Sequence, residues 1–231
     1  MYTLSNSHVK MNKKNTEDDF MTQNKTTQKT KRILPKLKIA VLTAITIILL
    51  TSCMTTPEQK YISVSRKLTD KGVLTSTQLA QFFRENNNEI SYFKIKKFAK
   101  IYIREAAMEN INSDVAFAQM CLETGYLTYG NLVTPEMNNF CGLGAMDAAH
   151  PGEYFQTPQI GVRAHIQHLQ AYATTAEVPL NNDLVDPRYN WVHKTKFAET
   201  VHDLAGNWAT DKEYGNKLDN ILYRMETLAN N

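Results

Sequence analysis

One segment near the middle of the chain is apolar around almost its whole circumference when it is drawn as a helix. Residues 114–124 are DVAFAQMCLET, and the apolar positions are Val115, Ala116, Phe117, Ala118, Met120, Cys121 and Leu122. A helix of this kind is stable only where other elements cover it on all sides. The segment therefore predicts a central helix that begins at an Asn112 or Ser113 cap and ends at Gly125, with further helices packed around it.

The surrounding sequence carries the 3.6-residue periodicity of helices rather than the alternation of strands. Further helices are predicted over residues 76–86, with Ser76 or Thr77 as the cap, and over residues 90–110, 158–176, 197–208 and 211–228. Residues 126–157 are rich in Gly and Pro, which predicts a loop with room for one short hairpin around Tyr154 and Phe155. The expected fold is therefore a single, mainly α domain with a minor β element.

The N-terminal segment has the features of a signal peptide. Residues 39–50, IAVLTAITIILL, follow Lys36 and Lys38 and are nearly all apolar. Such a segment is too short to cross the roughly 30 Å hydrocarbon core of a membrane as a helix. Residues 50–53, LTSC, resemble the cleavage box of bacterial lipoproteins, in which the Cys, here Cys53, is lipidated and becomes the N-terminus. A plain secretory signal with an incidental Cys, or a short buried helix, is the alternative.

This leader predicts three parts, with residues 1–52 as the signal peptide, 53–60 as the lipidated Cys and a short tether, and 61–231 as the folded domain. Three acids at residues 17–19 are unusual in a signal peptide, so the true start is expected near Met21. The protein is then exported and anchored by lipid to the cell envelope. Because Met54 rather than Asp follows the lipidated residue, the outer membrane is favoured in a bacterium with two membranes.

The charge of the chain is divided between the leader and the domain. The whole chain carries +3, but residues 1–38 hold nine Lys and Arg against three acids, a net charge of +6. Residues 39–52 are uncharged, so the remaining 17 basic and 20 acidic residues leave the rest of the chain at −3. Because the basic excess belongs to the leader, no nucleic-acid partner is expected for the domain.

Two polar residues interrupt the central helix. Gln119 and Glu123 are four residues apart and so lie on one stripe of it. Burial disfavours the charged form of a carboxyl, and the negative end of the helix dipole acts in the same direction. Both effects raise the pKa of Glu123, as a general acid that works near neutral pH requires. A Glu that reaches solvent at the helix end, beside Gly125, is the alternative.

Three segments, in this order, resemble the bacterial glucosaminidase family (glycoside hydrolase family 73), which includes peptidoglycan autolysins. Residues 118–125, AQMCLETG, resemble its AQxxLE[ST]G segment, residues 138–143, NNFCGL, its NNLFGI stretch, and residues 208–218, WATDKEYGNKL, its YATDxxYxxKI segment. The resemblance implies a lysozyme-like, mainly α fold with a small β-lobe. It also implies that the substrate is peptidoglycan, cleaved at the β-1,4 bond between N-acetylglucosamine and N-acetylmuramic acid.

The resemblance implies roles for individual residues as well. Glu123 falls on the general acid of the family, and Tyr214 falls on a Tyr implicated in its active site. Cys141 stands where the family usually has an aromatic residue, which is a departure from its pattern. Peptidoglycan glycan strands are the implied partner, the domain is expected to be a monomer, and no cofactor is expected.

The group that acts at the sugar carbon C1 stays open. A second carboxylate serves in many glycosidases, and the loop offers Glu136, Asp147 and Glu153. Glu153 is preferred because it lies thirty residues past Glu123, beside the expected hairpin, where members of this family can supply a second acid. An equal alternative is the 2-acetamido group of the substrate itself, with Tyr214 helping to position it.

Substrate-binding residues are expected beside these motifs. The candidates are Gln119, Tyr126, Asn139, Phe140 and Tyr154. Aromatic faces suit stacking on sugar rings, although aromatic side chains also serve in core or hairpin packing. Two other functions compete with the hydrolase: a lytic transglycosylase on the same type of fold, and a non-catalytic lipoprotein that binds the cell wall.

The Cys and His residues of the domain point to no metal site. Cys121 and Cys141 could form a disulfide in an exported protein or remain two buried thiols. His165 and His168 have an i, i+3 spacing that could hold a metal, but no accompanying ligand pattern, so none is expected.

Overall fold

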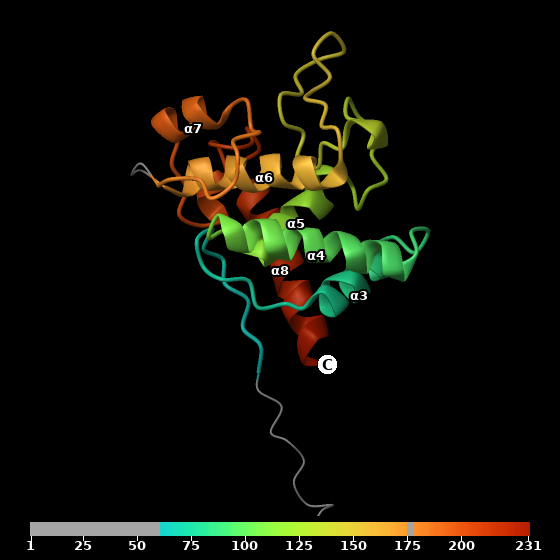
Figure 1. Ribbon diagram of the computed structural model, residues 1–231. Helices are drawn as coiled ribbons and strands as arrows, with labels where there is room; N and C mark the ends of the chain where they lie inside the picture. The colour runs from blue at the N-terminus through green and yellow to red at the C-terminus, as the bar shows by residue number, and fades with distance from the viewer. Residues whose placement is uncertain (1–60, 175–177) are drawn as a thin grey trace, which may run out of the picture. The chain divides into compact units, whose positions relative to one another are not determined.

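The expected mainly α fold is confirmed by the computed structural model, which has six α-helices within residues 61–174 and 178–231, the parts of the chain that it describes (Figure 1). They are α3 (Ser76–Asn86), α4 (Tyr92–Met108), α5 (Ser113–Glu123), α6 (Pro158–Ala173), α7 (Tyr189–Thr195) and α8 (Tyr214–Asn230). α5 is the predicted central helix, and it contacts α3, α4, α6 and α8. Nine of its eleven residues are buried, as its apolar circumference predicts.

Local capping decides where these helices begin. The side chain of Asn112 caps α5 by accepting hydrogen bonds from the backbone N–H groups of Asp114 and Val115, as predicted. α3 is capped by Thr75 rather than by Ser76 or Thr77, because Thr75 forms a capping box with Gln78. These caps fix the residues at which α3 and α5 begin.

The prediction of a helix over residues 197–208 is wrong. This stretch contains only the 3₁₀ turn η2 (His202–Leu204), and its first part is extended. The backbone N–H of Leu68 donates to the carbonyl oxygen of Glu199 at 2.9 Å, and that of Val201 donates to the carbonyl oxygen of Arg66 at 3.0 Å. Extended pairing therefore takes up hydrogen-bonding groups that a helix would need. The short helix α7, just before this stretch, was not predicted, since its seven residues are fewer than the periodicity argument needs.

The β element predicted within residues 126–157 is also not found. In the described residues the only β pairings are isolated bridges, and the one in this loop joins Asp147 to His150. The loop contains the 3₁₀ turn η1 (Pro135–Met137) and projects beyond α6 (Figure 1). Turns and backbone hydrogen bonds hold the loop without forming a regular strand, and they include those from Glu153 N–H to the Leu143 carbonyl at 2.8 Å and from Phe155 N–H to the Met137 carbonyl at 2.9 Å.

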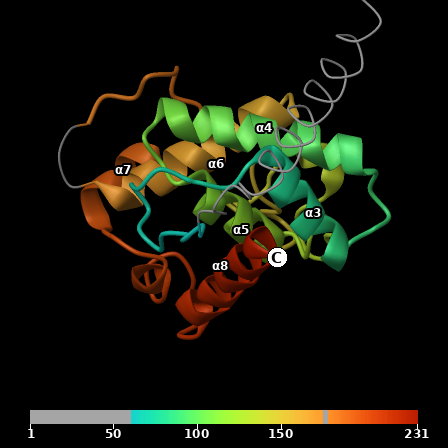
Figure 2. The ribbon, with the colours of Figure 1, turned by 90° about the horizontal axis from the view of Figure 1, so that it is seen from below.

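The last helix, α8, packs on the side of α5 that faces away from the projecting loop (Figure 1). Figure 2 shows α8 beneath α5, with α3 beside it, and both helices contact α8. The first described residues are tied to α8 by Arg66, whose guanidinium lies 2.6 Å from Asp219 and 2.9 Å from Glu226. Gly215 lets the start of α8 approach η2, because a Cβ there would lie 2.6 Å from Cα of His202.

The predicted leader, with its apolar segment and Cys53, lies outside the described residues. All described residues belong to one compact unit. Within the described ranges, no helix combines the length and the apolar character needed to cross a membrane.

Candidate active site

A cavity of about 330 Å³ opens beside the last turn of α5. The residues that line it are Glu123, Thr124, Tyr129, Asn131, Leu132, Val133, Asn139, Cys141, Gly142, Ala145, Trp208, Ala209 and Tyr214. Glu123 is the only carboxylate that residues 61–174 and 178–231 contribute to this lining. All three segments that resemble the glucosaminidase family therefore contribute to one cavity, although they are far apart in the sequence.

The carboxyl of Glu123 is oriented by two donors. Its Oε1 accepts a hydrogen bond from Nε1 of Trp208 at 2.9 Å and another from the hydroxyl of Tyr214. Burial raises the pKa of Glu123 above its ordinary value, against the opposing effect of these two hydrogen bonds. With Oε1 occupied by two donors, Oε2 is the oxygen that can carry the proton. Gly142 keeps the space beside it open, since a Cβ there would lie 3.9 Å from Oε2.

A buried chain of hydrogen bonds holds Tyr214 from behind. Nε2 of Gln119 donates to the Tyr214 hydroxyl at 2.8 Å, and Oε1 of Gln119 lies 3.0 Å from Nε2 of His165. Nδ1 of His165 lies 3.0 Å from the hydroxyl of Tyr102. In this arrangement His165 carries its proton on Nε2, Gln119 turns its amide nitrogen toward Tyr214, and the Tyr214 proton is left for Glu123.

Burial keeps every member of this chain neutral. It lowers the pKa of His165 to about 3, and it raises the pKa of Tyr102 and of Tyr214 well above the ordinary value of a tyrosine. The carboxylate of Glu123 raises the pKa of Tyr214 further. Tyr214 is therefore a hydrogen-bond donor to Glu123 and does not ionise at neutral pH.

A strained turn after α5 places Tyr129 in the cavity. Gly125, Tyr126, Leu127 and Tyr129 all have a positive φ, between 55° and 61°, which is costly for the residues other than Gly. The turn is secured by Thr124, whose hydroxyl accepts the backbone N–H of Leu127 at 2.9 Å. This geometry brings an aromatic ring into the lining at a position that no periodic pattern could have marked.

Asn139 organises the opposite wall of the cavity. It is fully buried, and its Oδ1 accepts the backbone N–H of Leu143 at 2.9 Å and that of Cys141 at 3.4 Å. Its Nδ2 donates to the carbonyl oxygens of Leu143 and Glu153, at 2.9 Å and 3.1 Å. Asn139 thus lines the cavity, but its amide is used by the loop backbone.

The structure gives two of the other predicted substrate-binding residues packing positions. Tyr126 packs on Phe82 and Phe83, with ring centroids 6.2 Å and 5.9 Å apart, and is absent from the cavity lining. Phe140 is buried against Phe98, with centroids 4.8 Å apart. Neither ring is free to stack on a sugar in the cavity.

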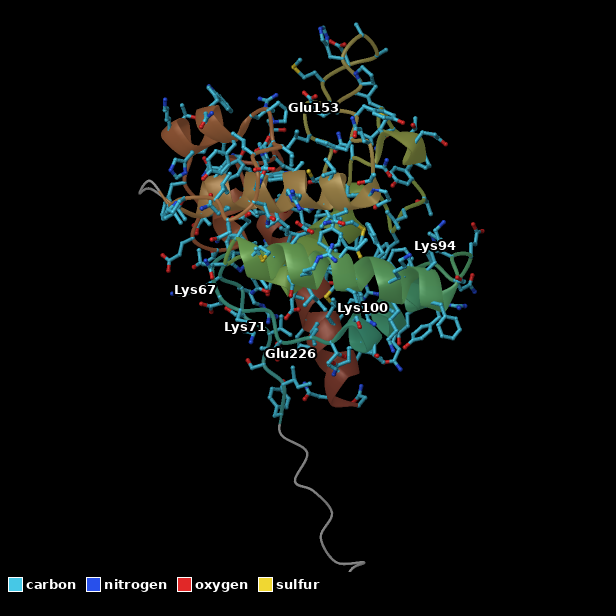
Figure 3. The ribbon with its side chains drawn as sticks, viewed as in Figure 1. Lys67, Lys71, Lys94, Lys100, Glu153 and Glu226 are labelled. Carbon is cyan, nitrogen blue, oxygen red and sulfur yellow. The ribbon has the colours of Figure 1, made fainter. Side chains whose placement is uncertain are left out.

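Three further predicted residues also lie outside the lining of the cavity. Gln119 is buried behind Tyr214, and Tyr154 is 67% exposed on the projecting loop. Glu153 lies on the same loop, above α6 in Figure 3, and its Oε1 would lie 3.1 Å from a Cβ on Gly144. The structure therefore brings Tyr214 to Glu123 but does not bring Glu153 to the cavity.

Sequence reasoning missed Trp208 as a partner of Glu123 and His165 as a part of the site. Trp208 opens the third family-like segment, so its place in that motif was the available signal. Cys121 and Cys141 are buried and free, and burial raises the pKa of both thiols. His165 and His168 make separate hydrogen bonds, and in the described residues no three potential ligands gather into a metal site.

The mainly α fold is consistent with a lysozyme-like architecture, and it places one buried carboxyl at a cavity. A carboxylic acid beside the substrate is one of the groups that glycoside hydrolases use. Comparison with known proteins specifies the class further. The model of the glucosaminidase family, described as mannosyl-glycoprotein endo-beta-N-acetylglucosaminidase, matches residues 99–227, and the chain belongs to this family. Membership confirms the resemblance carried by the three segments and supports peptidoglycan hydrolysis as the general activity.

One curated protein is similar over most of the chain. A protein of Borreliella burgdorferi, described as an uncharacterized protein, is 39% identical over 168 residues, which cover 73% of this chain and 79% of that protein. No solved structure matches the chain.

Proposed function

We propose that this protein cleaves the β-1,4 bond between N-acetylglucosamine and N-acetylmuramic acid in peptidoglycan, with Glu123 as the general acid. The observation that carries the proposal is the environment of the Glu123 carboxyl. Burial raises its pKa, and its Oε1 accepts hydrogen bonds from Trp208 and Tyr214. A general acid needs both a raised pKa and a fixed direction for its proton.

The proton leaves from Oε2 of Glu123 and passes to the glycosidic oxygen as the bond from C1 to that oxygen breaks. The electron pair of the broken bond stays on the leaving oxygen, and positive charge develops at C1. Glu123 becomes a carboxylate, which the hydrogen bonds from Trp208 and Tyr214 stabilise in its buried position. The neutral chain through Gln119 and His165 keeps Tyr214 in the donating orientation throughout.

The 2-acetamido group of the substrate is proposed to act at C1. Among the residues that the structure describes, Glu123 is the one carboxylate that lines the cavity, and Glu153 lies instead beside Gly144. The acetamido oxygen bonds to C1 as the leaving sugar departs, which closes a five-membered oxazolinium ring. Water then attacks C1 and breaks the new bond from C1 to the acetamido oxygen, while the Glu123 carboxylate accepts the water's proton. The product has a free reducing end, and the anomeric configuration is retained.

A lytic transglycosylase is the second candidate, because it also needs only one carboxylate in the cavity. In that reaction a hydroxyl of the muramic acid residue replaces water and leaves an anhydro end. The two products differ by the mass of one water. The single carboxylate is compatible with both reactions, and the family match favours the hydrolase.

The test is digestion of purified peptidoglycan by the wild type, by Glu123→Gln and by Glu153→Gln, followed by borohydride reduction and mass spectrometry. Loss of a general acid lowers the rate by about 10²–10⁴-fold, so Glu123→Gln is expected to be inactive and Glu153→Gln to stay within about threefold of the wild type. Fragments with a reduced N-acetylglucosamine end support the proposal. Anhydro-muramic ends would identify a transglycosylase, and glycan binding without any cleavage by the wild type would identify a non-catalytic wall-binding protein.

The same proposal extends to location. The apolar segment and the LTSC sequence that ends at Cys53 support export and lipid anchoring, which suit an enzyme whose substrate lies outside the cytoplasm. Incorporation of a labelled fatty acid into the wild type, and its loss in Cys53→Ala, tests the anchor. Labelling that persists in the variant would contradict it.

A further inference from the structure

A second cavity adjoins the catalytic cavity on the side of α7. It has a volume of about 230 Å³ and shares four lining residues with the first cavity: Cys141, Gly142, Ala145 and Trp208. Its other walls are residues 143–146 of the projecting loop, two residues of α6 and the start of α7. In Figure 1, α7 and the projecting loop both rise above α6. A strand that occupies the catalytic cavity could therefore continue into this second space.

Arg188 gives the second cavity a positive charge. No carboxylate in the described ranges forms an ion pair with it, since Asp186 is used elsewhere. Oδ2 of Asp186 lies 2.8 Å from Nδ1 of His168, and its Oδ1 accepts the backbone N–H of Arg188 at 2.8 Å. The side-chain donors of Arg188 are thus available to a ligand that carries a carboxylate.

Trp191 holds this guanidinium and offers a surface of its own. Cζ of Arg188 lies 5.4 Å from the centroid of the Trp191 ring, a cation–π contact that does not use the hydrogen-bond donors of the guanidinium. Trp191 lines the cavity but is 53% exposed, which is unusual for so large an apolar side chain. An exposed indole beside a cationic group suits a sugar ring that bears an acid.

We propose that the second cavity is a sugar subsite in which Arg188 pairs with a carboxylate carried by the glycan strand, while Trp191 packs on the ring of that sugar. The identity of the glycan rests on the function proposed above. In peptidoglycan every second sugar carries a lactyl group, whose carboxyl is either free or joined to a peptide with carboxylates of its own. The subsite thus makes the enzyme selective for acidic glycans over neutral ones of the same backbone.

Binding is measured by calorimetry in the Glu123→Gln variant of the full chain, so that turnover does not remove the ligand. The probes are peptide-free glycan strands with intact lactyl carboxyls, the same strands after methyl esterification, and strands that keep their peptides. Adding Arg188→Gln is expected to weaken binding of a carboxylate-bearing strand by about tenfold or more. Lys194→Gln removes a charge from an exposed position of α7, the helix that follows Arg188, and is the matched control, with an expected change below about twofold.

The three probes separate the sources of the carboxylate. If the lactyl group supplies it, esterification weakens binding as much as Arg188→Gln does, and the two changes together have no additional effect. If the peptide supplies it, only the peptide-bearing strands lose affinity in Arg188→Gln. Either pattern supports the subsite. Equal binding of all strands with and without Arg188, or no binding of any strand, would overturn it.

Trp191→Ala gives an independent measurement. It is expected to weaken binding of intact and of esterified strands alike, because packing on a ring requires no charge. Unchanged binding of both would overturn the role of Trp191. Failure of the subsite is distinguishable from failure of the proposed function, since the binding is measured without turnover and the function is tested by the cleavage products of the wild type.

Discussion

The two walls of the catalytic cavity are built in different ways. One wall is helical: Glu123 ends α5, Tyr214 begins α8, and a buried chain of hydrogen bonds through Gln119 and His165 holds them. The other wall is the loop of residues 129–145, which is held by turns and by the side chain of Asn139. In the proposed mechanism the helical wall positions one proton, whereas the loop wall shapes the space for a sugar.

This difference separates two tasks that a glycosidase has to perform. A proton donor needs a fixed distance and direction, which packed helices supply with little freedom. Recognition of an extended strand needs surface, which loops supply and can vary without loss of the core. Substitutions in the helical wall should therefore change the rate of the reaction, and those in the loop wall should change binding and local stability.

The largest contrast is expected between two tyrosines. Tyr214→Phe removes a donor from Glu123 and leaves Nε2 of Gln119 without its partner, so kcat should fall about 10–100-fold. Because the lost hydrogen bond lowers the pKa of Glu123, that pKa rises in the variant, and the fall of activity at alkaline pH moves to higher pH. Tyr129→Phe, in the loop wall, should change kcat less than about threefold. Both variants are measured by pH–rate profiles. Equal losses of kcat in the two variants would contradict the division of tasks between the helical wall and the loop wall.

A smaller effect is expected at Asn139. Asn139→Ala leaves up to four backbone groups of the loop without their partner, which should lower the free energy of unfolding by about 2–3 kcal/mol and Tm by about 4–10 °C. KM should rise several-fold while kcat changes less. Asn131→Ala, which changes an exposed residue of the same wall, is the control for the measurement of stability by calorimetry. A fall in kcat without a change in Tm or KM would place Asn139 in the chemistry instead.

His165, in the helical wall, should make the free energy of unfolding depend on pH. Its folded pKa is about 3, below the value of about 6.5 in an unfolded chain, so the unfolded state binds more protons between these values. Stability contributed by neutral His165 is therefore present above pH 6.5 and is lost as the pH falls toward 3. His165→Gln keeps a donor toward Gln119 but cannot titrate. Denaturant unfolding measured from pH 7 to 4 should show that the free energy of unfolding falls less steeply with decreasing pH in this variant than in the wild type. An equally steep fall would contradict a neutral, buried His165.

The smallest expected effect has the opposite sign. Burial raises the folded pKa of Glu123, so the native state holds its proton more tightly than the unfolded state. The protein is then destabilised as the pH rises above about 4.5 toward the raised pKa, and this loss is complete above it. Glu123→Gln removes the loss and should raise Tm at pH 7 by about 2 °C or more, with no gain near pH 4. A lower Tm of the variant at pH 7 would contradict a destabilising effect of the buried Glu123 carboxylate.

The sequence determined the parts of this protein that follow from local physics. The apolar circumference of residues 114–122 required a surrounded helix, and Asn112 was able to cap it. The glucosaminidase-like segments marked Glu123 and Tyr214, which lie in contact in the structure. These features could be predicted because periodicity, capping and a family motif are written in neighbouring residues.

Only the tertiary structure decided which side chains reach the acid and which serve in packing. Tyr126 and Tyr129 are three residues apart with similar left-handed backbones, yet one packs on α3 and the other lines the cavity. Trp208 and His165 join the site through contacts with residues far away in the chain. The predicted helix over residues 197–208 gave way to pairing with residues 66–68, because long-range hydrogen bonds override local propensity and leave no trace in a short window of sequence.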